Sequence, residues 1–95
     1  MEEQLNSISG GVTSPRALTF GEKAVGLTFN PGGNPKVDEI KKLYAQIIDL
    51  CNNEKIQNSV DEEFKANEKG RLFSIAITEA QAAQMWAVKA ITWQN

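Results

Sequence analysis

The sequence predicts a mainly α protein: an antiparallel hairpin of two helices, preceded by an extended or short β N-terminal arm, and oligomeric. One observation is an apolar face with helical spacing between Val37 and Cys51. The other is a second helical segment, Arg71 to Trp93, that is apolar nearly all round. The chain has 95 residues, so it forms one domain at most. We expect residues 1–17 to be a mobile arm and residues 18–95 to be the single hairpin domain.

The composition argues against several classes of function. Histidine is absent and Cys51 is the only cysteine, so side-chain nitrogen and sulfur ligands cannot assemble a zinc site. No nucleophile–base pair or carboxylate dyad is visible, and the commonest general base is missing. The net charge is −2 without a basic tract, which disfavours long nucleic acid. No apolar run approaches the ~20 residues of a membrane span. We therefore expect no enzyme, no metal, no cofactor and no membrane contact.

The N-terminal region is polar and rich in glycine, serine and proline as far as Arg16, which is typical of a loosely docked arm. From Leu18 to Phe29, β-branched and aromatic residues surround Gly21 and Gly26. This pattern fits either a short β-hairpin or a segment lying extended across the helices.

The clearest turn in the chain is FNPGGNP, residues 29–35. Its two glycines can adopt positive φ without steric cost, Asn34 is a good N-cap, and Pro35 is a good first helical residue. The first helix follows and is expected to fade in the polar run Asn52 to Asn58. A capping-box pattern, Ser59 to Glu62, then predicts the start of the second helix, which Gly70 would interrupt.

The second helix carries a line of small residues that predicts self-association. Five alanines recur at alternating steps of four and three, so they form one seam along a helix. They are Ala76, Ala80, Ala83, Ala87 and Ala90. Such a seam lets another backbone approach closely, while large apolar side chains lie on both flanks. One short partner helix cannot cover this surface, so we expect a second copy of the chain to do so.

Three groups of residues could bind a small phosphorylated ligand. The first is the turn, where Phe29 offers a flat face for a base, Asn30 offers side-chain donors, and Gly32 offers a backbone N–H near a helix N-terminus. Glycine-rich turns are, however, common helix starts, and the acidic residues just after this one oppose an anion. As an alternative, the turn only starts the helix.

The other two groups lie on the second helix. Arg71, Ser74 and Thr78 share one helical stripe and would suit a phosphodiester. Alternatively, the two hydroxyls bond to their own helix and Arg71 pairs with a neighbouring carboxylate. Lys89 and Thr92, bracketed by two tryptophans, could hold a phosphate beside a stacked base. More often, such tryptophans are core anchors and the lysine is solvated.

Two segments together resemble a known family. VGLTFNPGGNPKVDEIKKLYAQIIDLC (Val25 to Cys51) and RLFSIAITEAQAAQMWAVKAITW (Arg71 to Trp93) are similar to small phage proteins that share the anti-CBASS and Thoeris anti-defence hairpin domain. The resemblance implies a non-catalytic sponge in the cytoplasm of the infected bacterial host. Such a sponge sequesters cyclic oligonucleotides or cyclic ADP-ribose isomers. The resemblance further implies a dimer, or a hexamer built from dimers, with pockets between protomers.

The resemblance also suggests roles for individual residues. The FNP turn favours the Thoeris anti-defence branch, in which Phe29 and Asn30 would contact the base and sugar. The resemblance also implies phosphate contacts near a three-fold axis, made by Arg71, Ser74 and Thr78. It further implies a second inter-subunit site, lined by Lys89 and Thr92. The main alternative from the residues is a structural or regulatory phage oligomer without a ligand. A helical adaptor for a protein partner is a further possibility.

Overall fold

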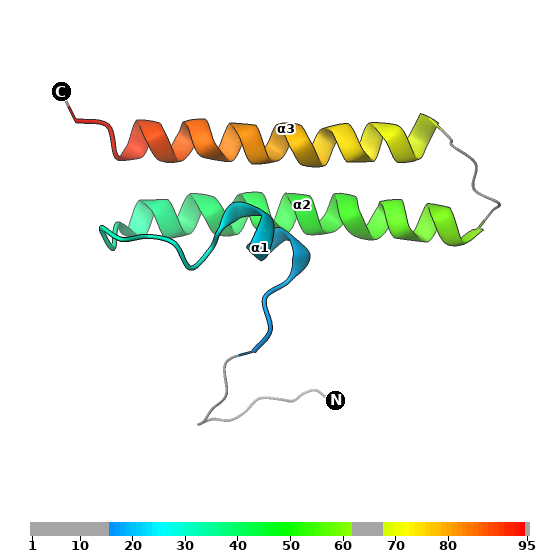
Figure 1. Cartoon of the computed structure of the whole chain (residues 1–95), viewed down its shortest axis with the longest axis horizontal. Coiled ribbons are helices and arrows are strands. Elements are labelled where there is room, and N and C mark those ends of the chain that lie inside the picture. The colour runs from blue at the N-terminus through cyan, green and yellow to red at the C-terminus, as the bar shows by residue number, and fades with distance from the viewer. Residues whose placement is uncertain (1–15, 62–67, 95) are drawn as a thin grey trace.

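A computed structural model describes the chain at residues 16–61 and 68–94, and the side chains at residues 16–57 and 68–94. These residues form three helices, α1 (Phe20–Val25), α2 (Pro35–Asp61) and α3 (Glu68–Ile91). Helices α2 and α3 lie side by side and antiparallel, and α1 packs mainly against α2 (Figure 1). The predicted helical hairpin is confirmed. Most of the expected mobile arm lies outside the described residues, so its mobility stays a prediction.

The expected β structure between Leu18 and Phe29 is wrong, because this segment contains helix α1 and the described residues contain no strand. A capping box starts α1: the Glu22 N–H donates to Thr19 Oγ1 over 3.1 Å, and the Thr19 N–H donates to Glu22 Oε1 over 3.0 Å. Gly26 ends the helix with φ of 64°. Caps at both ends thus stabilise this six-residue helix, although its aromatic and β-branched residues have a low helix propensity.

The predicted start of α2 is confirmed, but two other boundaries were wrong. The Lys36 N–H donates to Asn34 Oδ1 over 2.8 Å, which makes Asn34 the N-cap before Pro35. The helix then continues through the polar run to Asp61, because solvent-facing helical positions accept polar side chains. The predicted capping box at Ser59 therefore does not start the second helix, because Ser59 lies in the last turn of α2. Helix α3 begins at Glu68, so Gly70 lies in its first turn and interrupts nothing.

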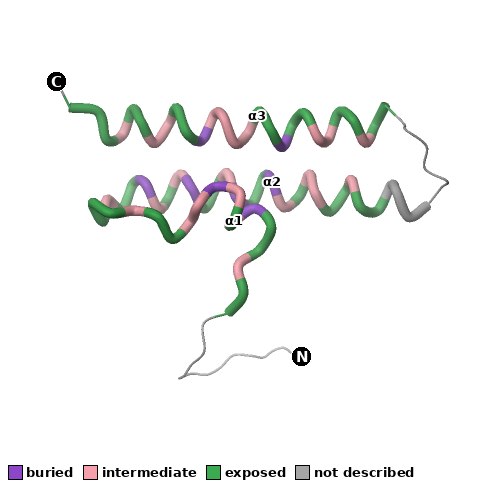
Figure 2. The backbone as a smooth tube through the Cα atoms, in the orientation of Figure 1, coloured by how far each residue is buried: buried purple, intermediate pink, exposed green. Residues whose placement is uncertain are grey.

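The core lies between the three helices, on their facing sides (Figure 2). Ile48 is fully buried at its centre, with Val25 of α1, Ala45 of α2 and Ile77 of α3 around it. Cys51 packs against this cluster from α2, as its position in an apolar helical row suggested. The buried core is small, as expected for a chain of this length.

Helix α3 is not buried all round within one chain, as expected for an apolar helix that a single partner helix cannot cover. Of the alanine seam, Ala80 packs against the core, whereas Ala76 and Ala90 are exposed. Met85 and Trp86 are largely exposed, the latter at 70%. A single chain therefore leaves much of this apolar helix in contact with water. None of the described helices is long and apolar enough to cross a bilayer.

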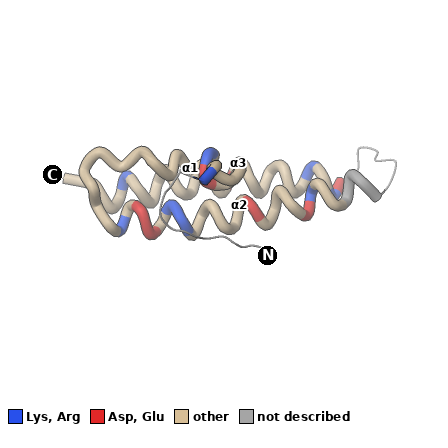
Figure 3. Tube along the Cα trace, turned by 90° about the horizontal axis from the view of Figure 1, so that it is seen from below, with Lys and Arg blue, Asp and Glu red and all other residues tan. Residues whose placement is uncertain are grey.

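Charged residues of both signs are interspersed along the described helices (Figure 3). Three ion pairs join described side chains: Arg16 with Glu22, Lys36 with Glu39, and Glu68 with Arg71. Each of these pairs is local in sequence, and two of them are a single helical turn apart. Such pairs on exposed surfaces contribute little to stability. The described surface therefore offers no extended basic track to a nucleic-acid backbone.

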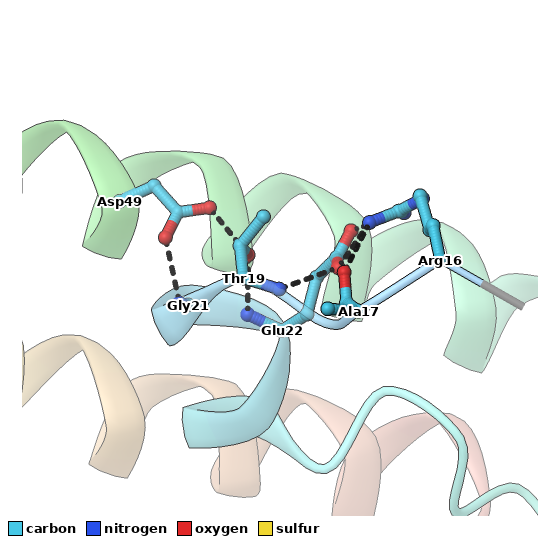
Figure 4. Close-up of polar contacts among 6 residues, drawn as sticks. All are labelled: Arg16, Ala17, Thr19, Gly21, Glu22 and Asp49. Atoms are coloured by element: carbon cyan, nitrogen blue, oxygen red, sulfur yellow. Dashed lines mark hydrogen bonds and ion pairs between the residues drawn. The ribbon is translucent and has the colours of Figure 1, made fainter. Parts of the chain in front are cut away.

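The docking of α1 depends on one carboxylate of α2 (Figure 4). Asp49 accepts a hydrogen bond from the Gly21 N–H and another from the Thr19 hydroxyl, each over 2.7 Å. Gly21 also lies so close to α2 that an added Cβ would be 2.1 Å from the Ala45 carbonyl oxygen. Arg16 forms a two-bond ion pair with Glu22, at 2.8 and 2.7 Å. The bond from Arg16 and one from the Thr19 N–H lower the pKa of Glu22 to about 2.

Candidate ligand-binding cavity at the turn end of the hairpin

A cavity of about 570 Å³ opens where the turn before α2 meets the C-terminal end of α3. Figure 1 shows both segments at the same end of the hairpin. The cavity therefore brings the predicted turn group together with one member, Thr92, of the predicted group at the end of α3. Phe29, Asn30 and Gly32 line it from the turn, and Thr92 lines it from the end of α3. We call this space the turn cavity.

The backbone of the turn is held by its own hydrogen bonds. The Gly33 N–H donates to the Asn30 carbonyl over 2.9 Å, and Gly33 adopts φ of 63°, which favours glycine. The Asn30 side-chain nitrogen donates to the Asn34 carbonyl (2.8 Å) and to Asp38 Oδ1 (3.0 Å). Both amide hydrogens of Asn30 are therefore engaged within the turn. Its oxygen, which accepts from the Asn34 N–H, retains a free lone pair.

Phe29 places an exposed aromatic side chain at the edge of the turn cavity. The residue is 71% exposed, yet both polar groups of its backbone are bonded. The N–H donates to the Gly26 carbonyl over 2.9 Å, and the carbonyl accepts from Lys41 Nζ over 2.6 Å. An exposed aromatic side chain on a fixed backbone loses little further entropy when a flat ligand stacks on it.

Lys41 is a charged residue on the buried face of α2. Only 5% of Lys41 is exposed. Its Nζ donates to the carbonyls of Gly26 and Phe29 over 2.9 and 2.6 Å, and lies 5.6 Å from the centre of the Phe29 ring. The sequence does contain a signal for this position, because Val37, Lys41, Ala45 and Ile48 recur at helical spacing along one buried face. Lys41 also lines the turn cavity.

The α3 side of the cavity contributes Thr92 and Trp93. The Thr92 hydroxyl donates to the Val88 carbonyl over 2.9 Å, a bond back to its own helix. Trp93 is mostly exposed, and Lys89 Nζ lies 5.6 Å from its ring centre. Lys89 does not itself line the turn cavity; it borders a separate depression of about 280 Å³ together with Trp86.

Arg71, Ser74 and Thr78 do share one stripe, as predicted, and line an open depression of about 310 Å³ on α3. The guanidinium of Arg71 is already paired, however: Nε and Nη2 donate to the Glu68 carboxylate over 3.1 and 2.6 Å. This hydrogen bonding lowers the pKa of Glu68 and raises that of Arg71. A ligand phosphate in this depression would have to displace or share the Glu68 partner.

The turn cavity has the equipment for binding an aromatic, anionic molecule. It combines an exposed ring, a second aromatic residue and a buried ammonium, and its volume is within the range of about 300–1,000 Å³ typical of small-molecule sites. Among the described residues, no cluster of three or more His, Cys, Asp or Glu side chains could hold a metal ion.

Comparison with known proteins identifies the family. Residues 22–92, most of the chain, match the Acb2/Tad1 hairpin domain. No curated protein and no solved structure matches the chain. The matching family is known for sequestering cyclic nucleotides and is not a known class of enzyme. The resemblance seen in the sequence is thus confirmed, and the chain belongs to the Acb2/Tad1 hairpin-domain family.

Proposed function

We propose that this protein is a non-catalytic phage immune-evasion sponge that sequesters cyclic nucleotide second messengers in the cytoplasm of the infected bacterial host. The ligand classes are cyclic ADP-ribose isomers, as in the Thoeris anti-defence branch, and cyclic di- or trinucleotides. The single observation that carries the proposal is the turn cavity, which places an exposed aromatic ring beside a buried ammonium. Membership of a family known for cyclic nucleotide sequestration supports it.

The chemistry of the cavity fits such ligands better than it fits most small metabolites. A cyclic nucleotide presents flat bases and closely spaced phosphate groups. Stacking of a base on an aromatic side chain contributes about 1–3 kcal/mol, and Phe29 offers its ring for this at little entropic cost. In this proposal, the free lone pair of Asn30 and the backbone of Gly32 contact the sugar edge. Thr92 lines the opposite wall.

The proposal includes a second, weaker site on the outer stripe of α3. Arg71, Ser74 and Thr78 contact ligand phosphates there once several chains bring their stripes together around a symmetry axis. The Arg71 fork of each chain is paired to Glu68, so a ligand phosphate there must displace or share that carboxylate, and several converging copies would offer it several guanidinium forks. Lys89, beside Trp93, would line an inter-subunit pocket in the same assembly.

Self-association is part of the proposed function. Leu72, Ile75 and Trp86 are exposed in the single chain and recur at helical spacing on one side of α3. Exposed apolar stripes of this kind are typical of subunit interfaces. We propose a homo-oligomer, a dimer or a hexamer built from dimers, with binding pockets completed between subunits. The alternative is an oligomer of structural or regulatory role in which the same stripe assembles and no small molecule binds.

The test is calorimetric titration of the purified protein with cyclic dinucleotides, cyclic trinucleotides and cyclic ADP-ribose isomers. Tight binding, with intact ligand recovered after heat denaturation, is the expected result. Recovery of degraded ligand would show catalysis and overturn the sponge mechanism. Absence of binding across the panel, for a protein that sediments as an oligomer, would favour the structural alternative.

Phe29→Ala is the informative variant for locating the site. Removal of an exposed ring should not destabilise the fold, since Phe29 is held through its backbone. We expect its affinity to fall about 5- to 150-fold, corresponding to about 1–3 kcal/mol of stacking. Phe20→Ala is a matched control, because Phe20 is also exposed but lies on α1 outside the turn cavity. Equal losses in both variants would contradict binding at the turn.

A further inference from the structure

Helix α1 is attached to α2 at both of its ends. At its N-terminal end, the half-buried Asp49 accepts hydrogen bonds from the Gly21 N–H and the Thr19 hydroxyl, each over 2.7 Å (Figure 4). The Gly21 N–H is one of the donors that a helix N-terminus leaves without an intrahelical partner. At the other end, the Gly26 carbonyl accepts from Lys41 Nζ over 2.9 Å. Lys41 lies about two turns before Asp49, so α1 runs antiparallel to α2 between them.

The C-terminal end of α1 also sets the position of the aromatic residue at the turn cavity. The Gly26 carbonyl accepts the Phe29 N–H over 2.9 Å. The chain just after Gly26 is in turn fixed on α1, because the Leu27 N–H donates to the Glu22 carbonyl over 3.0 Å. Phe29, which lines the cavity, therefore takes its backbone position from the last turn of α1.

We propose that Asp49 is a positioning residue for ligand binding in the turn cavity. By holding α1 on α2, it fixes the Gly26 carbonyl and, through that carbonyl, the backbone of Phe29. Asp49 lies outside the lining of the cavity, so it acts on the site from a distance. This inference rests on the proposed function and adds a residue on which the geometry of the site depends.

The attachment of α1 depends strongly on this carboxylate because little apolar area supports it. Within α1, the buried residues are Gly21 and Val25, and glycine has no side chain to bury. Asp49 supplies two charge-assisted bonds at the N-terminal end, which are stronger than bonds between neutral groups. A chain without this carboxylate should populate a form in which α1 is undocked and Phe29 is displaced.

Charge and geometry predict opposite effects when Asp49 is removed. Loss of a negative charge would, by electrostatics alone, strengthen the binding of an anionic ligand. Undocking of α1 would weaken binding, because the apparent dissociation constant rises as the binding-competent fraction of the protein falls. The sign of the change therefore separates a positioning role from a purely electrostatic one.

The first experiment compares two substitutions that remove the same charge. Cyclic ADP-ribose is titrated first, and cyclic di-AMP if the former does not bind, against wild-type protein, Asp49→Ala and Asp49→Asn. Asparagine keeps an oxygen for the Gly21 N–H and offers its amide to the Thr19 hydroxyl oxygen. We expect affinity about 5-fold or more weaker for Asp49→Ala and an intermediate affinity for Asp49→Asn. Unchanged or tighter binding by Asp49→Ala would overturn the proposal and leave the proposed function standing.

The competing explanation is that Asp49 contributes only to global stability, and a double-mutant cycle with Phe29→Ala tests it. If Asp49 acts through Phe29, Asp49→Ala should cost less than about 2-fold in affinity once the ring is absent, because coupled residues are not additive. A residue that supports only global stability would weaken binding by the same factor in both backgrounds. Equal factors would therefore contradict the positioning role.

Hydrogen exchange on the wild-type protein decides the matter even if the Asp49 variants fail to fold. A ligand that binds only the form with α1 docked must stabilise that docking. On saturation with the nucleotide, we expect exchange of the Gly21 N–H to slow about 10-fold or more, and by a larger factor than that of Lys55, which lies beyond Asp49 on α2. Binding without added protection of Gly21 would overturn the role of Asp49 alone. A wild-type protein that binds neither nucleotide would overturn the proposed function as well.

Discussion

Gly21→Ala is the substitution that most directly tests how α1 is attached to the hairpin. Intrinsic helix propensity alone favours alanine over glycine in a helix by about 1 kcal/mol. The packing predicts the opposite sign, because the new Cβ would be only 2.1 Å from the Ala45 carbonyl oxygen, which is backbone and cannot rotate away. Ordinary contact begins at about 3.4 Å, so α1 would have to move outward by more than 1 Å.

The magnitude follows from what that movement breaks. The Gly21 N–H to Asp49 bond would stretch from 2.7 Å beyond useful range, and a bond to a charged acceptor contributes about 1.5–3 kcal/mol. Val25, buried on the same helix, would be partly exposed, which costs up to about 1.5–3 kcal/mol. After subtracting about 1 kcal/mol for propensity, we expect a destabilisation of about 2–5 kcal/mol.

Urea denaturation at one fixed protein concentration measures this change in the free energy of unfolding, with concentration fixed because self-association adds to apparent stability. Gly32→Ala is the matched control, since Gly32 has negative or extended φ and nothing within 4 Å of an added Cβ. We expect the control to differ from wild type by less than about 0.5 kcal/mol. A Gly21→Ala protein as stable as the wild type would refute the close approach of α1 to α2.

Three further outcomes are expected. Gln84 is buried and its Oε1 has no hydrogen-bond partner among the described residues, so Gln84→Met should raise the free energy of unfolding by about 1–2 kcal/mol in the same urea assay; a loss of stability would reveal a partner for that oxygen. The pKa of Glu22 is lowered to about 2, so its contribution is present above about pH 4.5 and is lost as the pH falls toward 2. The stability difference between wild type and Glu22→Gln should therefore shrink across that interval in acid titrations followed by circular dichroism, and a constant difference would contradict the Arg16–Glu22 pair. Trp86→Glu should lower the sedimentation mass if the exposed stripe of α3 is an interface, whereas an unchanged mass would exclude Trp86 from it.

The hairpin could be predicted from the sequence because the main signals for its helices are local. The apolar spacing of α2 and the cap formed by Asn34 and Pro35 require only neighbouring residues, and both are found in the structure. Helix α1 also had a local signal, Thr19 followed three residues later by Glu22. Its β-branched and aromatic residues obscured that signal, although two caps outweigh propensity in so short a helix.

The boundary between α2 and α3 was predicted incorrectly for a different reason. A run of asparagine, glutamate and glutamine reads as a loop when judged by polarity, yet residues facing water need only be compatible with helical geometry. Ser59 lies inside α2, which continues to Asp61, so the capping-box pattern at Ser59 starts no helix. Capping patterns specify a helix start only where the preceding chain leaves the helical conformation.

The candidate site shows why cations are hard to assign from sequence. Arg71 was a candidate phosphate ligand because it shares a helical stripe with two hydroxyls, but an exposed guanidinium readily pairs with a carboxylate one turn away, here Glu68. Lys41 looked unremarkable among charged neighbours. Its location in the buried stripe depends on how the rest of the chain covers α2, and there its Nζ donates to two backbone carbonyls. Helical spacing therefore predicts the carboxylate partner of an exposed cation such as Arg71, whereas the partners of a buried cation such as Lys41 come from segments that only tertiary packing brings together.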